Sequence, residues 1–368
     1  MQIVHVVGAR PNFMKAAPVM AALSAYGNIS QVLVHTGQHY DANMSDIFFD
    51  QLGLPRPDIN LEVGSGSHAQ QTAQIMVRFE DAVTKARPDL VLVYGDVNST
   101  VAAALVCSKL QIPVGHVEAG LRSFDRTMPE EINRLITDQI ADLLFTPSCD
   151  GDENLLREGV SPEKIHLVGN VMIDTLVRLL PTAEKTWPAL RSTLNLNGRY
   201  CLVTLHRPSN VDSQSGLVPI MEVLRDICKD VKVLFPVHPR TRRKLSECGI
   251  SLDHPGFLAM EPVGYVEFLA LQHHSTIVIT DSGGIQEETT FLNIPCLTMR
   301  DNTERPVTVT SGTNVLIGSD MDYLRTEVDK ILEGGCKTSR IPPLWDGRAG
   351  QRIAEIVAPG KWRINTRQ

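Results

Sequence analysis

The sequence lacks the features that would assign it to several classes of protein. No apolar run approaches the length of about 20 residues that a membrane-spanning helix needs. Acidic residues outnumber basic ones by 42 to 35, which gives a formal net charge of -7. The basic residues form no concentrated stripe of the kind that binds nucleic acid. We therefore expect neither a membrane protein nor a nucleic-acid-binding protein.

The seven cysteines also lack a pattern. They are odd in number and widely scattered, and no pair has the spacing of a metal site or a redox motif. Several lie in apolar, strand-like runs, where cysteine acts as a small hydrophobic side chain in a reducing compartment. The opening residues MQIVHVVGARPNF lack the basic start of a signal peptide. The sequence therefore predicts a cytoplasmic protein.

The sequence does contain a regular alternation of short apolar runs and longer amphipathic segments. The apolar runs are nearly continuous, as expected for parallel strands that are covered on both faces. These predicted strands are residues 3–7, 32–35, 90–94, 114–117, 144–147, 165–168, 201–205, 233–237, 258–261, 276–280, 295–299 and 315–317. The predicted helices are residues 13–25, 69–85, 100–110, 130–143, 216–229 and 323–332. The alternation predicts an α/β fold of doubly wound parallel sheets.

A length of 368 residues suits two domains better than a single core. The alternation weakens after a helix near residue 171, where Pro181, Pro188 and a polar stretch follow, and we place the crossover between the domains there. Each domain would hold about six strands. The predicted boundaries are residues 1–172 for the first domain, 173–348 for the second, and 349–368 for a last helix that packs back on the first domain.

Two cations follow the first predicted strand. Open parallel sheets bind ligands beyond the carboxyl ends of their strands. Arg10 and Lys15 lie there in the run GARPNFMK, where the N-terminus of the next helix adds partial positive charge. This arrangement predicts a site for an anion, most simply a phosphate. The alternative is an ordinary strand–helix turn with solvated cations.

Three carboxylates, Asp96, Glu118 and Glu130, follow later strands of the same predicted sheet. Carboxylates that gather in a cleft repel one another and shift their pKa values, which suits general acid–base chemistry. Glu130 could instead stabilise the N-terminus of the helix that begins after Pro129. For the neighbouring Glu131 we prefer this structural role.

Two histidines follow strands of the second half. His206 precedes Arg207, and His238 precedes Pro239 and Arg240. A histidine at a strand end is a suitable partner for a diphosphate or a general acid. By contrast, we assign the neighbouring histidines 273 and 274 to structure or surface.

The run DSGGIQEE follows the predicted strand 276–280. Gly283 and Gly284 would let a phosphate approach the backbone, and Ser282 could cap the next helix and donate a hydrogen bond. Glu288, further along that helix, could accept both ribose hydroxyls of a nucleotide. The run is neither a P-loop nor a GxGxxG fingerprint, which disfavours dinucleotide redox chemistry.

Segments along nearly the whole chain, taken in this order, closely resemble the non-hydrolysing UDP-N-acetylglucosamine 2-epimerases: GARPNFMK, HTGQHYD, YGDVNST, HVEAGLRS, MPEEINR, TLHRPSN, FPVHPR, TDSGGIQEE and MRDNTERP. The resemblance implies two Rossmann-like domains of the glycosyltransferase-B (GT-B) fold, with a UDP-sugar bound in the cleft between them. It implies a homodimer, no cofactor and no required metal. It also implies a reaction in which UDP is eliminated to give 2-acetamidoglucal and is then added back to form UDP-N-acetylmannosamine.

The resemblance also assigns roles to individual positions. The implied catalytic residues are Asp96, Glu118, Glu130 and His206. The implied substrate contacts are Arg10, Lys15, His238, Ser282, Gly283, Gly284 and Glu288. Some members of the family have a second, allosteric UDP-sugar site, which would lie near Gln38, Gln71 and Glu131.

Four alternatives stay open at this point. The run SFDRTMPEEINR also resembles relatives that act on UDP-2,3-diacetamido-2,3-dideoxyglucuronic acid. A hydrolysing epimerase would release free N-acetylmannosamine and UDP. A glycosyltransferase of the same fold would need an acceptor, and the carboxylates at the strand ends would be harder to explain. A non-catalytic sensor would keep Glu288 but could lose Asp96 or Glu118, and both are present.

Overall fold

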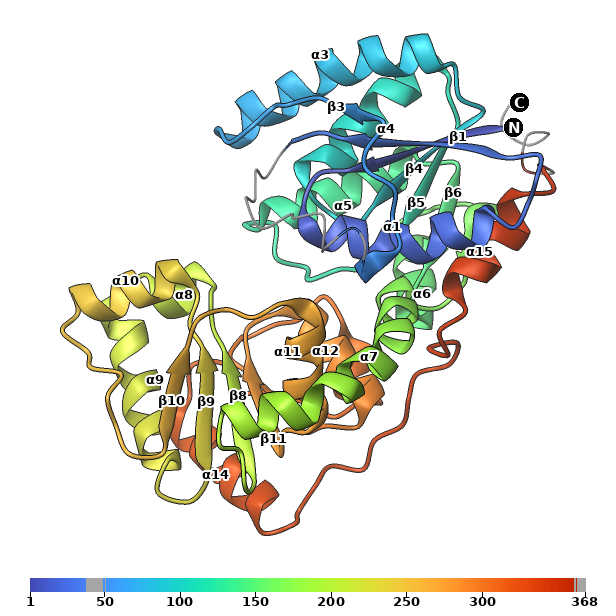
Figure 1. Cartoon of the computed structure of the whole chain (residues 1–368). Coiled ribbons are helices and arrows are strands. Elements are labelled where there is room, and N and C mark those ends of the chain that lie inside the picture. Colours follow the sequence, from blue (N-terminus) through green and yellow to red (C-terminus); the bar gives the residue numbers. More distant parts are fainter. Residues whose placement is uncertain (38–48, 50, 361, 363–368) are drawn as a thin grey trace. The chain divides into compact units, whose positions relative to one another are not determined.

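The structure, a computed structural model, describes residues 1–37, 49, 51–360 and 362 (Figure 1). The chain divides into two compact units. Unit 1 comprises Met1–Thr175 and Pro343–Gln368, and unit 2 comprises Leu176–Pro342. Within the described ranges, no helix is long and apolar enough to cross a membrane.

Unit 1 is built on a seven-stranded sheet in the order β3-β2-β1-β4-β5-β6-β7, in which all neighbours pair in parallel. Its strands are β1 (Gln2–Val7), β2 (Ser30–His35), β3 (Ile59–Asn60), β4 (Leu90–Tyr94), β5 (Val114–Val117), β6 (Leu143–Thr146) and β7 (Ile165–Leu167). Strands β2 and β3 follow β1 on one side of the sheet, and strands β5, β6 and β7 follow β4 on the other side. The carboxyl ends of β1 and β4 are therefore the switch point at which such sheets bind ligands.

Helices cover both faces of this sheet. They are α1 (Arg10–Leu23), α3 (His68–Ala86), α4 (Asn98–Leu110), α5 (Pro129–Ile140), α6 (Cys149–Arg157), the start of α7 (Val171–Thr193) and α15 (Ala349–Val357), with a short 3-10 turn at Pro162–Lys164. Helix α4 packs against α3 and α5, and α1 packs against α15. Figure 1 shows α3 and α4 on one side of the strands and α1 and α15 on the other. Apolar side chains of the strands and of α3 and α4 form a buried core.

The contact between α1 and α15 depends on a proline inside α1. Pro18 has no N–H, so the carbonyl of Met14 loses its helical partner. The buried hydroxyl of Thr175 donates to this carbonyl over 2.6 Å. Gly350 of α15 lies against Pro18, where a Cβ would come within 2.7 Å of the proline carbonyl oxygen. The carboxylate of Asp174 caps α15 by accepting the first two amides of that helix over 3.0 and 2.7 Å.

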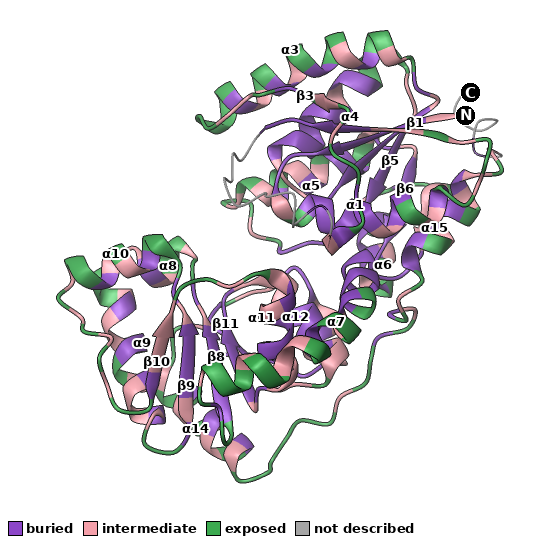
Figure 2. Cartoon of the chain, in the orientation of Figure 1, coloured by how far each residue is buried: buried purple, intermediate pink, exposed green. Residues whose placement is uncertain are grey.

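Unit 2 is built on a six-stranded parallel sheet in the order β10-β9-β8-β11-β12-β13. Its strands are β8 (Tyr200–Thr204), β9 (Lys232–Pro236), β10 (Phe257–Met260), β11 (Ile277–Thr280), β12 (Cys296–Thr298) and β13 (Asn314–Leu316). Its helices are the rest of α7, α8 (Pro208–Val211), α9 (Gln214–Ile227), α10 (Pro239–Glu247), α11 (Tyr265–His273), α12 (Gly283–Leu292), α13 (Pro306–Thr310) and α14 (Met321–Leu332). Figure 2 shows the central strands buried between these helices. The switch point lies between β8 and β11.

One expectation about an element was wrong. The sequence predicts that the helix near residue 171 ends before Pro181 and Pro188, but α7 runs through both as a single helix of 23 residues. Both prolines are exposed, so water can bond to the carbonyls that they leave without a helical partner. A proline that would break a buried helix is tolerated at such positions.

Candidate active site

Lys15 and Glu118 form a buried ion pair at the carboxyl edge of the sheet in unit 1. Lys15 lies in α1, which follows β1, and Glu118 directly follows β5. Their side chains are only 8% and 5% exposed. Gly95, which follows β4, lies against the pair, because a Cβ there would come within 2.7 Å of the Lys15 Nζ. The structure thus brings a predicted cation and a predicted carboxylate into direct contact.

The backbone of Glu118 adopts a left-handed conformation, with φ of 75°. Such a conformation costs a non-glycine residue about 1–3 kcal/mol and recurs at functional sites. The amides of Glu118 and Ala119 both donate to the carbonyl of Phe145, over 3.1 and 3.0 Å. The chain therefore holds the Glu118 carboxylate in place through its backbone as well as through Lys15.

A buried charge network fixes the loop that follows Glu118. Asp138 accepts from His116 Nδ1 over 2.6 Å and from Arg122 over 2.7 Å, and Arg122 also holds Glu158 in bidentate fashion over 2.8 and 2.6 Å. Burial opposes the ionisation of Asp138, but the charges and hydrogen bonds of His116 and Arg122 outweigh it and lower the pKa of this carboxyl. His116 Nε2 faces the carbonyl of Gly95 at 2.8 Å. The His116 ring is therefore held at both nitrogens, between Asp138 and the backbone that follows β4.

Arg134 of α5 organises a second pair of carboxylates. It donates to Asp96 through Nε and Nη2, over 3.0 and 2.6 Å, and to Glu131 through Nη1 over 2.6 Å. Glu131 is buried and also accepts from the amide and hydroxyl of Ser123 and from the amide of Phe124. Glu131 thus holds the loop before α5, which is a structural role other than the expected one at the helix N-terminus. Asp96 keeps 24% of its side chain exposed.

Arg10 and Glu130 also lie at this edge. Arg10 is the first residue of α1 and Glu130 is the second residue of α5, and both are half-buried. Both helices begin beyond the carboxyl ends of strands, since α1 follows β1 and α5 follows β5. The edge therefore carries every site residue that the sequence predicts for the catalytic part of the first half: Arg10, Lys15, Asp96, Glu118 and Glu130.

Gln71, one of the residues implied for an allosteric site, is buried in α3. Its amide nitrogen donates to a backbone carbonyl over 3.0 Å, and its oxygen accepts from Asn98 over 2.8 Å. Asn133 bridges Asn98 to the carbonyl of Asp96. Gln71 is thus connected to the loop of Asp96 through amide side chains. Gln38 lies outside the described residues.

In unit 2, His206 pairs with Asp281. His206 Nδ1 lies 2.8 Å from Asp281 Oδ1, and the two residues follow neighbouring strands, β8 and β11. Asp281 is fully buried and also accepts from the backbone amides of His206 and Arg207, over 3.0 and 2.8 Å. Burial opposes the ionisation of Asp281, but the His206 side chain and the Arg207 amide outweigh it and lower the pKa of the carboxyl. With Nδ1 held and half of the side chain exposed, Nε2 is the atom of His206 that is oriented for a ligand.

The two glycines at the start of α12 differ in their surroundings. A Cβ on Gly283 would come within 2.5 Å of a guanidinium nitrogen of Arg305, whereas a Cβ on Gly284 would meet no described atom within 4 Å. Gly283 therefore permits packing against a buried side chain, and the backbone at Gly284 borders open space. Ser282 occupies the N-cap position of this helix. An anion is stabilised at such a helix N-terminus.

Glu288 lies further along α12 and is buried. One oxygen accepts from the hydroxyl of Tyr265 over 2.7 Å, and the other lies 2.9 Å from the amide nitrogen of Gln272. Burial, with a smaller contribution from the charge of Glu287, raises the pKa of Glu288 to about 7. The carboxyl is thus close to half ionised at neutral pH.

His238 has an exposed side chain and is the N-cap residue of α10. Its Nδ1 accepts from the amide of Arg240 over 3.2 Å. The ring therefore carries its proton on Nε2, which can donate to an anion.

Sequence reasoning missed the partners that orient the predicted residues. Arg134 and Asp281 lie inside the segments MPEEINR and TDSGGIQEE. Each is a charged residue close to a predicted site residue, and this proximity in the sequence could have identified both. Tyr265 lies 23 residues from Glu288, and no local pattern connects the two.

A family model described as UDP-N-acetylglucosamine 2-epimerase matches residues 21–358. The chain belongs to this epimerase family. The family membership and the two parallel α/β sheets confirm the expected GT-B fold with two Rossmann-like domains.

Members of the 2-epimerase family match nearly the whole chain. The UDP-N-acetylglucosamine 2-epimerase of Methanococcus maripaludis is 44% identical over 359 residues, which are 96% of this chain and 97% of that protein. The UDP-2,3-diacetamido-2,3-dideoxy-D-glucuronate 2-epimerase of Pseudomonas aeruginosa is 43% identical over 367 residues, with 97% and 99% covered. The crystal structure of the Methanocaldococcus jannaschii UDP-GlcNAc 2-epimerase in complex with UDP-GlcNAc and UDP is similar with a TM-score of 0.89 and 43% identity, over 98% and 100% of the two chains.

Proposed function

We propose that this enzyme interconverts UDP-N-acetylglucosamine and UDP-N-acetylmannosamine by eliminating UDP and adding it back. The observation that carries the proposal is the set of carboxylates Asp96, Glu118 and Glu130 at one edge of the sheet in unit 1 of a 2-epimerase family member. The M. jannaschii relative, solved with UDP-GlcNAc and UDP, supports the choice of substrate. Such a product would supply a glycosyl-transfer step of polysaccharide synthesis.

The chemistry requires both an acid–base group and a stabilised leaving group. No carbonyl group lies next to C2 to acidify its proton, so cleavage of the C1–O bond must first build positive charge at C1. UDP leaves with the electron pair of that bond, a carboxylate takes the C2 proton, and a C1–C2 double bond forms. Return of a proton to the opposite face of C2 and of UDP to C1 completes the inversion. The carboxylates of unit 1 are suited to these proton transfers.

The nucleotide-binding groups lie in unit 2. We assign the diphosphate to the N-terminus of α12 at Ser282, Gly283 and Gly284, with the Nε2–H of His238 as a further donor. Glu288 accepts hydrogen bonds from the ribose hydroxyls. His206 stabilises the negative charge on the departing phosphate. In unit 1, Arg10 and Lys15 are the cations that stabilise negative charge on the substrate.

Incubation of the purified protein with UDP-N-acetylglucosamine as the sole substrate, followed by NMR, tests the function. We expect both UDP-sugars at equilibrium, with little free UDP. Stoichiometric release of UDP and free N-acetylmannosamine would indicate a hydrolysing epimerase instead. An unchanged substrate that reacts only when a sugar acceptor is added would indicate a glycosyltransferase.

A second substrate, UDP-2,3-diacetamido-2,3-dideoxyglucuronate, is favoured by one specific observation. The P. aeruginosa relative named for that sugar is 43% identical, close to the 44% of the M. maripaludis enzyme. The ratio of kcat/KM for the two UDP-sugars decides between them. We expect this ratio to favour UDP-N-acetylglucosamine, and a ratio that favours the diacetamido sugar would assign the enzyme to it.

We also propose a cytoplasmic homodimer that forms through unit 1. The dimer is implied by the family and is supported by an exposed apolar strip on α5, where Ile132 and Ile136 lie one turn apart with 37% and 36% of each residue exposed. The location is supported by the cysteines, because all seven are free thiols, as expected in a reducing compartment.

A further inference from the structure

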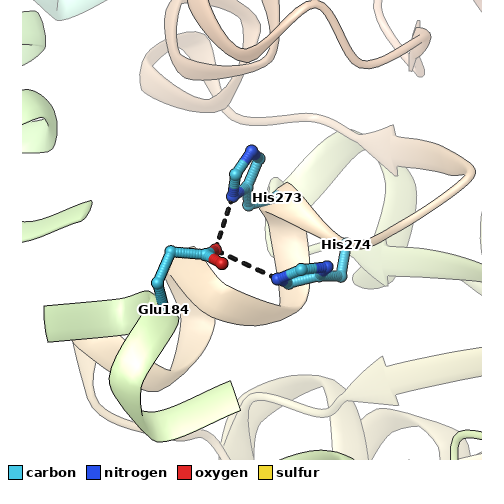
Figure 3. A group of neighbouring side chains, drawn as sticks. All are labelled: Glu184, His273 and His274. Atoms are coloured by element: carbon cyan, nitrogen blue, oxygen red, sulfur yellow. Dashed lines mark hydrogen bonds and ion pairs between the residues drawn. The ribbon is translucent and has the colours of Figure 1, made fainter. Parts of the chain in front are cut away.

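Glu184, His273 and His274 form a compact cluster in unit 2 (Figure 3). Glu184 lies on α7, His273 is the last residue of α11, and His274 caps the end of that helix. The cluster shares no residue with the groups that we assign to the nucleotide. Tyr265, which holds Glu288, is at the opposite end of α11, whereas Gln272, the other partner of Glu288, directly precedes His273.

Three potential ligand atoms converge in this cluster. His273 Nδ1 lies 2.7 Å and His274 Nε2 lies 3.0 Å from the same oxygen, Glu184 Oε1. All three ligand atoms lie within 4.8 Å of one another. In a tetrahedral zinc site, with bonds of about 2.0–2.1 Å, neighbouring ligand atoms are about 3.3 Å apart. The two distances from Glu184 Oε1 to the histidine nitrogens would each need to widen by less than about 1 Å to admit a cation.

The surroundings hold the ligands while leaving access from solvent. Trp187, one turn along α7 from Glu184, stacks on the His274 ring with centroids 4.2 Å apart and planes 5° apart. Such support from a neighbouring side chain fixes the orientation of a ligand ring. The side chains of His273, His274 and Glu184 are 33%, 30% and 41% exposed. A cation can therefore enter from water, and a water molecule can complete a four-coordinate shell.

We propose that Glu184, His273 and His274 bind a divalent transition-metal cation, with zinc as the best match to two imidazoles and one carboxylate. This site goes beyond the proposed epimerase reaction and needs no part of it. The cation would tie the exposed half of α7 to the C-terminal end of α11, and so stabilise unit 2. The two histidines would thus have a structural role, which is one of the two roles that the sequence predicts for them.

Zinc titration of the tag-free, full-length protein tests the site, after metal has been removed with a chelator. A chromophoric competitor reports the affinity of the wild type, Glu184→Gln, His273→Gln and a control, His254→Gln, which changes a half-buried histidine of unit 2 outside the cluster. We expect one zinc ion per wild-type chain. The two cluster variants should bind at least about tenfold more weakly, and the control should match the wild type. Equal affinity in all four proteins, or no stoichiometric binding by the wild type, would overturn the proposal.

A cobalt spectrum provides a readout that needs no variant. Cobalt(II) in a four-coordinate nitrogen–oxygen site absorbs visible light far more strongly than the hydrated, six-coordinate ion. We expect this strong absorption in the wild-type protein with one equivalent of cobalt, and its loss when zinc is added. A weak six-coordinate spectrum would contradict the proposed site even if a cluster variant failed to fold.

Discussion

At the scale of single residues, the carboxylates of unit 1 differ in what holds them. Glu118 is paired with Lys15, Asp96 is held by Arg134, and Glu130 is half-buried at the start of α5. Removing the charge of Glu118 would leave the buried Lys15 without this carboxylate partner. The loss of a buried ion-pair partner destabilises a protein, and this effect would be mixed with any effect on catalysis. Glu130 is therefore the cleanest position at which to test acid–base chemistry.

Glu130→Gln keeps the size of the side chain but removes its ability to accept a proton. General acid–base catalysis contributes about 10²–10⁴-fold to a rate, so we expect kcat to fall by about that factor. Binding of UDP should not change, because we assign this group to the sugar rather than to the nucleotide. Steady-state kinetics and calorimetry measure the two quantities, with the exposed Glu163→Gln as a control. Full activity in Glu130→Gln, Asp96→Asn and Glu118→Gln alike would remove the carboxylates from the mechanism.

The raised pKa of Glu288, about 7, predicts that UDP binding depends on pH. In the proposed complex the ribose hydroxyls donate to the ionised carboxylate, so binding favours ionisation and releases a proton. If the bound form is fully ionised, the UDP affinity should rise about tenfold between pH 6 and pH 8. Calorimetry of the wild type and of Glu288→Gln isolates this effect from the titration of UDP itself. The same pH dependence in both proteins would place the ribose elsewhere.

The raised pKa of Glu288 also makes the stability of the fold depend on pH. The folded pKa of Glu288, about 7, lies above the ordinary value of 4.5, so the folded state binds the proton more tightly than the unfolded state. The contribution of this group to stability is therefore present below pH 4.5 and is lost as the pH rises towards 7. A buried carboxyl that weakens the free protein is consistent with a group kept for binding.

At the scale of elements, the hydroxyl of Thr175 replaces the hydrogen bond that Pro18 removes from α1. Thr175→Val keeps the shape of the side chain but leaves the buried carbonyl of Met14 without a donor. We expect a loss of about 1–3 kcal/mol in the free energy of unfolding. Thr175→Ser, which keeps the hydroxyl, should lose much less. Denaturant unfolding compares the variants, and equal stability of the valine and serine proteins would show that the hydroxyl has no such role.

The central strands were predictable because their sequences are continuously apolar. Strands β4 and β5 have the predicted bounds, residues 90–94 and 114–117. Short elements without clear periodicity were not predicted, among them β3, of two residues, and α13, which is rich in β-branched side chains. The pairing of His206 with Asp281 joins positions 75 residues apart. Strand-end positions thus indicated which residues lie at the carboxyl edges of the two sheets, while their partners depend on tertiary contacts.

At the scale of the whole molecule, we expect a homodimer. Light scattering of the eluting protein should give twice the chain mass of 40.6 kDa. Ile136→Glu places a charge on the exposed apolar strip of α5 and should shift the mass towards that of the monomer. A mass of one chain, independent of concentration in the wild type, would rule out the dimer.

Exchange of the C2 hydrogen with solvent tests elimination and re-addition of UDP most directly. The enzyme is incubated with UDP-N-acetylglucosamine in D₂O, and the UDP-N-acetylmannosamine formed is analysed by NMR and mass spectrometry. Because the C2 proton passes to a carboxylate that exchanges with solvent, we predict one deuterium at C2 of the product. We also expect traces of glycal and UDP after long incubation. Product that retains the original hydrogen at C2 would contradict elimination–addition and require an inversion that leaves the C2–H bond intact.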